Sequence, residues 1–392
     1  MKRNFIAKRF QSAGTGLTLD TAALAKYKDI VDLSIGDTDF TTDEAIINAA
    51  FRDAKAGYTH YGDPKGDPEL ISAVCKAWEE DFDQSLPRDH VLVSASSCLG
   101  MALVMLAILD PGDEVIVFSP YFALYRAQIE LAGGVCVDVP TYAEEDYAIS
   151  EERLRAAITP RTKCLILPYP NNPTGGIMTR EDLEAIAEVL RDTNILVLSD
   201  EIYSELTYGR KHVSIAEIDG MWERTIYVSG FSKAFAMTGW RLGYVCAPEP
   251  IAKQMLKIHQ YAIMSAPTLS QYAAIVALRE CDQEVQKMVD EYNRRRRMLV
   301  DGFNRIGLTC FNPEGAFYMF PCIRSTGMTS EEFCETLLQE EKVAVVPGNA
   351  FGESGEGFVR VSYAYSLKHL QEALVRIERF VQRHQEGNQC EQ

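Results

Sequence analysis

Several features that mark particular protein classes are scarce in this sequence of 392 residues. The longest apolar run, at residues 98–109, is too short to span a bilayer and is typical of a buried helix. The first ten residues are basic but lack the apolar stretch that a signal peptide has. The net charge of −17 argues against binding to nucleic acid or to an anionic membrane. It still allows a local positive pocket for a small anion.

The cysteine and histidine residues show no metal-binding pattern. The ten cysteines are scattered without a Cys-x-x-Cys pair, and the six histidines have no spacing that suits a metal ion. This usage is typical of free thiols in a reducing compartment. The sequence therefore predicts a cytoplasmic protein and no zinc or iron–sulfur site.

Short apolar runs alternate with helical patterns through the middle of the chain. We expect strands, rich in β-branched residues and buried on both faces, at residues 91–95, 114–118, 134–139, 164–169, 195–199, 225–228 and 242–247. Helix-length segments lie between several of them, such as residues 180–192 with Thr179 as the N-cap. This alternation predicts an α/β fold, in which a mostly parallel sheet between helices binds ligands at the carboxyl ends of its strands.

The last third of the chain has a different pattern. Helical segments run from about residue 269 to 304 and include four arginines at residues 294–297, which we interpret as a solvated helix face. Strand signals follow at residues 316–320, 343–346 and 358–361, and then an amphipathic helix at residues 367–385. We predict a large domain over residues 46–285 and a smaller α+β domain formed by residues 1–45 and 286–392.

The segment from Ser229 to Gly243 carries the strongest functional signal. It places Lys233 and Arg241 eight residues apart, directly after a predicted strand. A lysine among apolar residues is poorly solvated, which makes its amine a better nucleophile toward carbonyls. An arginine close behind it can hold a phosphate in a fork. The pair suits pyridoxal phosphate, although an isolated lysine of this kind more often has its amine in water.

Further candidates stand at the ends of other predicted strands. A pyridoxal-phosphate site also needs an acid beneath the pyridine nitrogen, a phosphate cradle and a clamp for the substrate carboxylate. Asp200 ends one strand and could be the acid, and Tyr203 could reach the ring hydroxyl. A helix-capping aspartate and a packed tyrosine are the structural alternatives. Asn172, in the turn Tyr-Pro-Asn-Asn-Pro-Thr-Gly-Gly, could point into the same cleft.

The cradle and the clamp have candidates as well. Ser96, Ser97 and Cys98 begin a helix, where free backbone N–H groups can bind an anion. Phe122 follows the next strand and could stack on a ring, or belong to the core. Arg360 lies inside an apolar strand, where either a substrate carboxylate or an internal salt bridge would explain it.

Taken in order, these motifs resemble one family along nearly the whole chain, the class I/II pyridoxal-phosphate aminotransferases of the aspartate-aminotransferase-like fold type I. The resemblance also rests on Leu-Ser-Ile-Gly-Asp-Thr-Asp-Phe from Leu33, Tyr-Gly-Asp-Pro-Lys-Gly from Tyr61, Pro-Glu-Gly-Ala-Phe-Tyr from Pro313 and Val-Pro-Gly from Val346. It implies a seven-stranded sheet in the large domain and a homodimer with shared active sites.

The resemblance implies a role for each matching position. Lys233 would bond to the cofactor and carry the proton between the substrate Cα and the cofactor C4′. Asp200 would pair with the pyridinium. The other contacts it implies are Asn172 and Tyr203 at the ring hydroxyl, Arg241, Ser96, Ser97, Cys98 and the neighbouring subunit's Tyr61 at the phosphate, and Arg360, Asn172 and the Gly36 backbone at the substrate carboxylate. From their positions we also expect Phe122 on the ring and Ser232 among the cofactor contacts.

Three positions depart from the usual pattern of that family. Thr38 stands where a proline is common. Gly230 stands where many relatives have a phosphate-binding serine, so that Ser229 or Ser232 would have to supply this contact. Cys98 stands where several aspartate-preferring relatives have a lysine, which disfavours a dicarboxylic specialist. Aromatic, branched, alanine-type and acidic donors stay open, with apolar or aromatic donors ahead.

The sequence thus predicts an aminotransferase that moves an amino group from an L-amino acid to a 2-oxo acid by a ping-pong mechanism. The same residues could serve a C–S β-lyase or a cyclopropane-carboxylate-synthase-like enzyme, although the segment from Gly36 to Phe40 resembles the transaminase version. A third alternative is the effector-sensing domain of a transcription regulator. An acidic chain without a helix-turn-helix pattern disfavours it.

Overall fold

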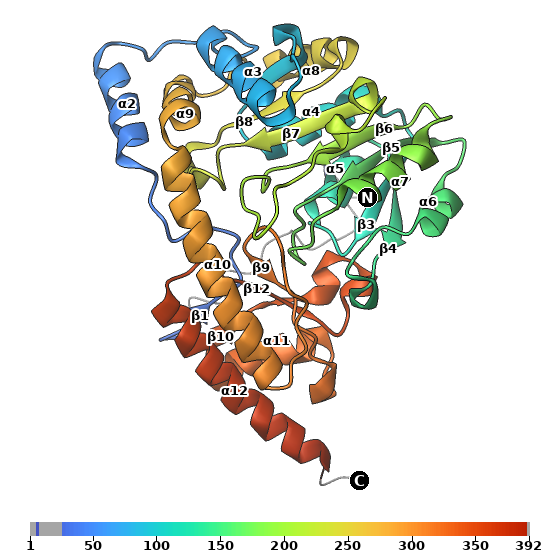
Figure 1. Cartoon of the computed structure of the whole chain (residues 1–392), viewed down its shortest axis with the longest axis vertical. Coiled ribbons are helices and arrows are strands. Elements are labelled where there is room, and N and C mark those ends of the chain that lie inside the picture. Colours follow the sequence, from blue (N-terminus) through green and yellow to red (C-terminus); the bar gives the residue numbers. More distant parts are fainter. Residues whose placement is uncertain (1–4, 8–25, 390–392) are drawn as a thin grey trace.

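A large seven-stranded sheet lies in the upper half of the computed structural model in Figure 1, which describes residues 5–7 and 26–389. Its strand order is β2-β8-β7-β6-β5-β3-β4. Strand β8 is antiparallel to its neighbours β2 and β7, and the other neighbouring pairs are parallel. The α/β class with a mostly parallel sheet is therefore confirmed.

The predicted strands of this sheet are also confirmed, with ends that differ by two residues or fewer. They are Val91–Ser94 (β2), Glu114–Ser119 (β3), Val135–Pro140 (β4), Thr162–Leu167 (β5), Leu196–Asp200 (β6), Thr225–Gly230 (β7) and Gly243–Cys246 (β8). The apolar run at residues 98–109 forms helix α4 (Ser97–Ile108). Across residues 5–7 and 26–389, no helix combines the length and apolarity needed to cross a membrane.

Helices cover both faces of the sheet because successive side chains of a strand point to opposite sides. On β3, Val115 and Val117 pack with α4, α5 (Leu124–Leu131) and α8 (Glu249–Ala262). Ile116 and Phe118 pack on the other side with α6 (Glu151–Ala157) and α7 (Arg180–Leu190). Burial on both faces is wrong for β4, where Val135 is 47% exposed, because this edge strand has a neighbour on one side only.

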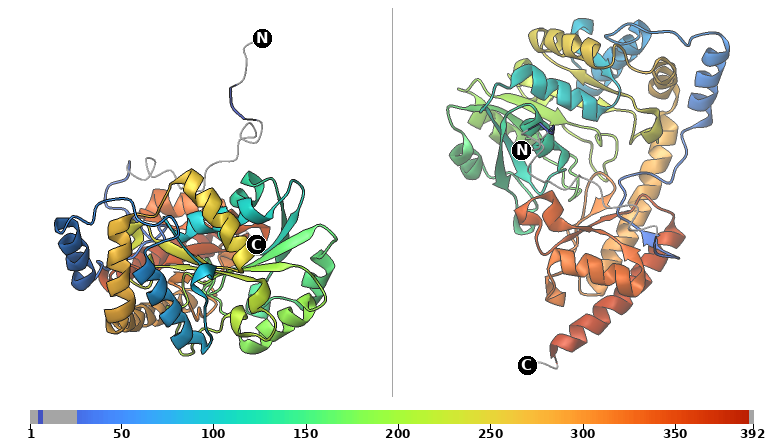
Figure 2. Two further views of the ribbon diagram at one scale, coloured as in Figure 1. Left: turned by 90° about the horizontal axis from the view of Figure 1, so that it is seen from above. Right: turned by 180° about the vertical axis from the view of Figure 1, so that it is seen from behind.

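Three helices, α2 (Glu44–Lys55), α3 (Pro68–Phe82) and α9 (Thr268–Glu280), share a core with strand β2 at the opposite edge of the sheet. From there the long helix α10 (Asp282–Arg305) runs down to the smaller sheets, as Figures 1 and 2 show. The helical pattern predicted for residues 269–304 is thus two helices that are separated at Cys281.

Two small sheets lie at the other end of α10. Strands β11 (Val346–Pro347), β12 (Val359–Ser362) and β9 (Tyr318–Met319) form one of them, and β1 (Val31–Asp32) pairs in parallel with β10 (Val343–Ala344) in the other. Helices α11 (Ser330–Glu341) and α12 (Leu367–Gln389) pack beside them. The proposed domain limits at residues 45 and 285 stay a prediction.

The arginines at residues 294–297 are solvated only in part. Arg294 and Arg297 are exposed, whereas Arg295 and Arg296 are only 5% and 9% exposed. Residues three apart share a face of a helix, so the outer two point to water and the middle two point inward. The interpretation of the whole run as a solvated face is wrong for these two.

The N-cap of α7 offers a test of the local structure. The Thr179 hydroxyl accepts a hydrogen bond from the Asp182 backbone at 3.2 Å, and the Asp182 carboxylate accepts one from the Thr179 backbone at 2.8 Å. We expect Thr179→Ala to lower stability by about 1 kcal/mol because one helix-end donor loses its partner. The urea midpoint of unfolding measures this loss. Thr179→Ser is the control, and an equal loss for serine would contradict the capping role.

Candidate active site

Lys233 lies just after strand β7, at the carboxyl end of the parallel strands. Its Nζ donates a hydrogen bond to the carbonyl of Gly36 at 2.6 Å. The ring centroids of Tyr203 and Phe317 lie 5.9 and 5.3 Å from this nitrogen. Gly36 has to be a glycine here, because a Cβ on it would come within 2.3 Å of the Tyr318 hydroxyl. The amine therefore stands in a half-buried, largely aromatic pocket.

Asp200 is the last residue of β6 and is 5% exposed. One carboxylate oxygen accepts a hydrogen bond from the Tyr125 hydroxyl at 2.7 Å, and the other accepts one from the Ile202 backbone at 3.3 Å. Burial raises the pKa of Asp200 to about 6, and the charge of Glu201 adds to this, while the two hydrogen bonds act against it. The site thus contains a desolvated acid whose carboxylate is fixed in direction.

Tyr203 is buried beside this acid. Its hydroxyl forms a 2.8 Å hydrogen bond with the hydroxyl of Tyr318. Burial raises the pKa of Tyr203, with a further rise from Tyr318 and a smaller one from Asp200, whereas Arg360 lowers it. Through Tyr318, whose ring lies under the guanidinium of Arg360, the Tyr203 hydroxyl is connected to the arginine on β12.

Arg360 is buried in the middle of β12, and its guanidinium has two supports. One nitrogen donates to the amide oxygen of Asn172 at 3.1 Å, and another donates to the backbone carbonyl of Ser34. The rings of Tyr318 and Phe351 flank it at 4.7 and 5.0 Å. Its Nε has no hydrogen-bond partner within the described chain. No acidic side chain pairs with it there, which disfavours the internal salt bridge.

The first turn of α4 packs directly on strands β7 and β8. A Cβ on Gly230 would lie 2.6 Å from the Ser97 hydroxyl oxygen, and one on Gly243 would lie 2.4 Å from the Ser97 nitrogen. Both glycines are therefore required for this close approach. The Ser97 hydroxyl donates to the Ser229 carbonyl at 2.9 Å, which leaves its backbone N–H at the helix start as the donor for an anion.

Three charged groups of the site shift the pKa of the Cys98 thiol. Burial raises the pKa of this thiol, and the charge of Asp200 raises it further, whereas Arg241 and Lys233 lower it. All three charges are therefore close to the start of α4. Arg241 is exposed, with a left-handed backbone, and donates to the Thr238 carbonyl at 2.6 Å.

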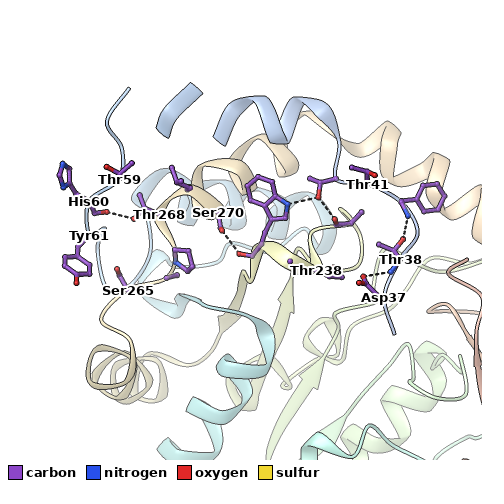
Figure 3. A pocket seen from close by; sticks show the side chains of 18 residues that line it. Asp37, Thr38, Thr41, Thr59, His60, Tyr61, Thr238, Ser265, Thr268 and Ser270 are labelled. Carbon is purple, nitrogen blue, oxygen red and sulfur yellow. Dashed lines mark hydrogen bonds between the residues drawn. The ribbon is translucent and has the colours of Figure 1, made fainter. Parts of the chain in front are cut away.

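Other predicted residues lie at the margin of this cluster. Phe122 and Ser232 are half-buried, and the Phe122 ring is 6.0 Å from the ring of Tyr125. Tyr61 is 89% exposed and lies in a groove of about 1230 Å³, apart from Lys233. Figure 3 shows Tyr61 and His60 at one end of this groove and Asp37 and Thr38 at the other. Thr238 and Gly239, just before Arg241, also line it.

Three residues of the site were not predicted. Tyr125 fixes the carboxylate of Asp200, Tyr318 pairs with Tyr203, and Ser34 supports Arg360. Tyr318 stands within a quoted motif, Pro-Glu-Gly-Ala-Phe-Tyr, which could have drawn attention to it. Tyr125 could not have been found in this way, because its pattern is that of a core residue in a helix. Ser34 could not have been found either, because it contributes a backbone carbonyl, which every residue has.

Known proteins resemble this chain in sequence and in fold. The family model for aminotransferase class I and II matches residues 28–377. An aspartate aminotransferase of Pyrococcus abyssi is 43% identical over 91% of this chain and 92% of its own. Aromatic-amino-acid aminotransferase 2 of Thermococcus litoralis is 42% identical over 89% and 91%. The structure of a Thermus thermophilus aspartate aminotransferase with maleate superimposes with a TM-score of 0.89, at 37% identity, over 96% of this chain and all of that one.

The chain belongs to the aminotransferase class I and II family. Its fold is that of the pyridoxal-phosphate-dependent transferases of fold type I, and it is an enzyme that transfers amino groups. These relatives are named for amino-group transfer, which favours it over the C–S β-lyase and cyclopropane-carboxylate-synthase-like alternatives.

The buried acid makes a prediction about the protein without cofactor. The pKa of Asp200 is raised above that of an unfolded aspartate, so the folded state binds the extra proton and stability falls as pH rises toward about 6. We expect cofactor-free Asp200→Asn to be more stable than wild type at pH 7, with the difference shrinking toward pH 4. Thermal unfolding at several pH values measures this difference. Asp192→Asn, at an exposed turn, is the control. A destabilised Asp200→Asn at pH 7 would show that burial of the Asp200 carboxylate does not destabilise the cofactor-free protein.

Proposed function

We propose that this enzyme binds pyridoxal phosphate at the Lys233 site and exchanges amino groups between L-amino acids and 2-oxo acids in a ping-pong cycle. The observation that carries the proposal is the shared location of three groups at the carboxyl end of the parallel strands. The amine of Lys233 follows β7, the buried acid Asp200 ends the neighbouring strand β6, and the start of α4 packs against the end of β7. When bound, the cofactor supplies the electron sink that allows an amino group to leave a carbon atom.

The residues fit such a group in charge and in shape. Asp200 is an acid whose burial disfavours its charge unless a cation lies beside it, as a protonated ring nitrogen would. Tyr203 and Asn172 would offer a hydroxyl and an amide to the ring hydroxyl. Phe122, one turn before Tyr125, would lie against the ring face.

The phosphate end would lie at the start of α4. The backbone N–H groups of Ser97 and Cys98, together with Ser96, and the guanidinium of Arg241 would hold its oxygens. Ser229 is buried, with its hydroxyl directed to the Glu201 carbonyl, so Ser232 is the better candidate for the contact that Gly230 lacks.

The substrate carboxylate would bind to Arg360, whose Nε has no partner in the described chain, with help from Asn172 and the backbone of Gly36. This grip would orient the substrate Cα toward Lys233. The amine of Lys233, once free, would act as a positioned acid–base group. It would carry the proton between the substrate Cα and the cofactor C4′. The aromatic rings around it would exclude water.

We also propose a homodimer with shared sites, in which the partner's Tyr61 reaches the phosphate. An 89% exposed tyrosine in an open groove beside Thr238 and Gly239 supports it.

Nine free cysteines in the described chain support a cytoplasmic location, where the enzyme would act in amino-acid biosynthesis. Cys98 stands where several aspartate-preferring relatives have a lysine, so apolar or aromatic donors are favoured over acidic ones.

An absorption spectrum of the purified enzyme tests the function directly. The visible band of the bound cofactor should change on mixing with particular amino acids, one at a time, and return on adding 2-oxoglutarate or pyruvate. The donors that cause the change name the substrate class. A band that changes only with release of ammonia, without a 2-oxo acid, would replace this proposal by a lyase.

Substitution of Lys233 tests the role of its amine. We expect Lys233→Ala to lower turnover by roughly 10²- to 10⁴-fold, because both proton transfers lose their acid–base group. Steady-state rates with the best donor measure this loss. Lys253→Ala, an exposed lysine on α8, is the matched control and should retain full activity. Turnover near the wild-type value in Lys233→Ala would refute the assignment.

A further inference from the structure

The two buried arginines of α10, Arg295 and Arg296, are adjacent in sequence but bind two different segments. The segment bound by Arg295 carries one support of Arg360, the carbonyl of Ser34, and the segment bound by Arg296 contacts the turn that carries the other, the amide of Asn172. The inference below rests on the proposed function, because it concerns how Arg360 is held for a substrate carboxylate.

Arg295 holds the segment that contains Ser34. Its guanidinium forms a fork on the carboxylate of Asp39, with N–O distances of 2.7 and 3.1 Å, and lies 5.1 Å from the ring centroid of Phe40. One turn away on α10, the Tyr292 hydroxyl bonds to the hydroxyl of Thr38. Three consecutive residues, 38–40, are thus fixed to one helix. The residues just before them accept hydrogen bonds from Lys233, at Gly36, and from Arg360, at Ser34.

Arg296 holds the other support through one intermediate loop. Its guanidinium donates to the Asn312 side chain and, at 2.9 Å, to the Pro313 carbonyl. The next two backbone N–H groups of that loop, at Glu314 and Gly315, both donate to the Gly175 carbonyl at 2.9 Å. Gly175 closes the turn that contains Asn172, through a 2.9 Å bond from its N–H to the Asn171 carbonyl.

We propose that Arg295 and Arg296 are positioning residues that fix Arg360 from opposite sides. Charge-assisted forks with buried donors are the strong and directional kind of hydrogen bond. Because both arginines stand on one helix, the two supports keep a fixed separation. Loss of either arginine frees one support, so that the guanidinium of Arg360 turns away from the carboxylate it should bind.

The test compares the inner arginines with the outer ones. We expect Arg295→Gln and Arg296→Gln to raise KM for pyruvate and for the best amino donor about tenfold or more, with a much smaller change in kcat. Such a split is the signature of lost ground-state binding. A variant that is only less stable would contain less active enzyme, which lowers kcat and leaves KM unchanged. Arg294→Gln and Arg297→Gln remove the same charge from exposed positions and should match wild type.

Hydrogen exchange gives a readout that does not depend on activity. Amides of residues 33–40 should exchange faster in Arg295→Gln, while those of residues 312–316 exchange at the wild-type rate. In Arg296→Gln the reverse is expected. Asp39→Asn should raise the exchange of residues 33–40 as Arg295→Gln does. The double variant Asp39→Asn/Arg295→Gln should show little more than either single variant, because both remove the same ion pair. Asp39→Asn is also the milder variant if Arg295→Gln folds poorly, since Asp39 is partly exposed.

Two results would overturn the proposal: equal KM values for the inner and outer variants, or unchanged exchange at residues 33–40 in both Arg295→Gln and Asp39→Asn. Failure of the proposed function has a different signature. In that case the wild-type enzyme itself would transfer no amino group, whereas the exchange comparison would still report on the two supports.

Discussion

The buried carboxylate of Asp200 is the constraint on which the rest of the site depends. A carboxylate that has lost its water favours the neutral form, and burial accordingly raises the pKa of Asp200 to about 6. A cation beside it reverses that preference. The same burial that weakens the cofactor-free protein would therefore strengthen its binding of the positively charged ring proposed above, and Tyr125 fixes the direction in which the carboxylate faces.

The parts of the site that depend on residue type at a strand end could be predicted from the sequence. Asp200 and Lys233 follow apolar strands, and Arg360 is a charge inside one, so each stands out against its neighbours. The mostly parallel sheet followed from the alternation of strands and helices, and its seven strands followed from the family resemblance, whereas the order of the strands came only from the structure. The start of α4 could be predicted for the same reason, as small polar residues between a strand and an apolar helix.

The parts that depend on distant partners could not be predicted. Arg295 binds Asp39 across 256 residues, and nothing in four consecutive arginines shows which two point inward. The carbonyl of Ser34 supports Arg360 through an atom that every residue has, so its type carries no signal. Tyr125 has the spacing of a core tyrosine, and only the fold places its hydroxyl on the acid.

The contact of α4 with Gly230 and Gly243 has a consequence for how this enzyme can move. The first turn of the helix touches the backbones of two strands with no side chain between them, so sideways motion of α4 would have to displace the sheet itself. In the proposed function, the phosphate end of the site would thus be as stiff as the sheet. Adjustment to substrates of different size would have to come from the chain segments outside the large sheet that surround Arg360. Selectivity and rigidity would in this way belong to different parts of the site.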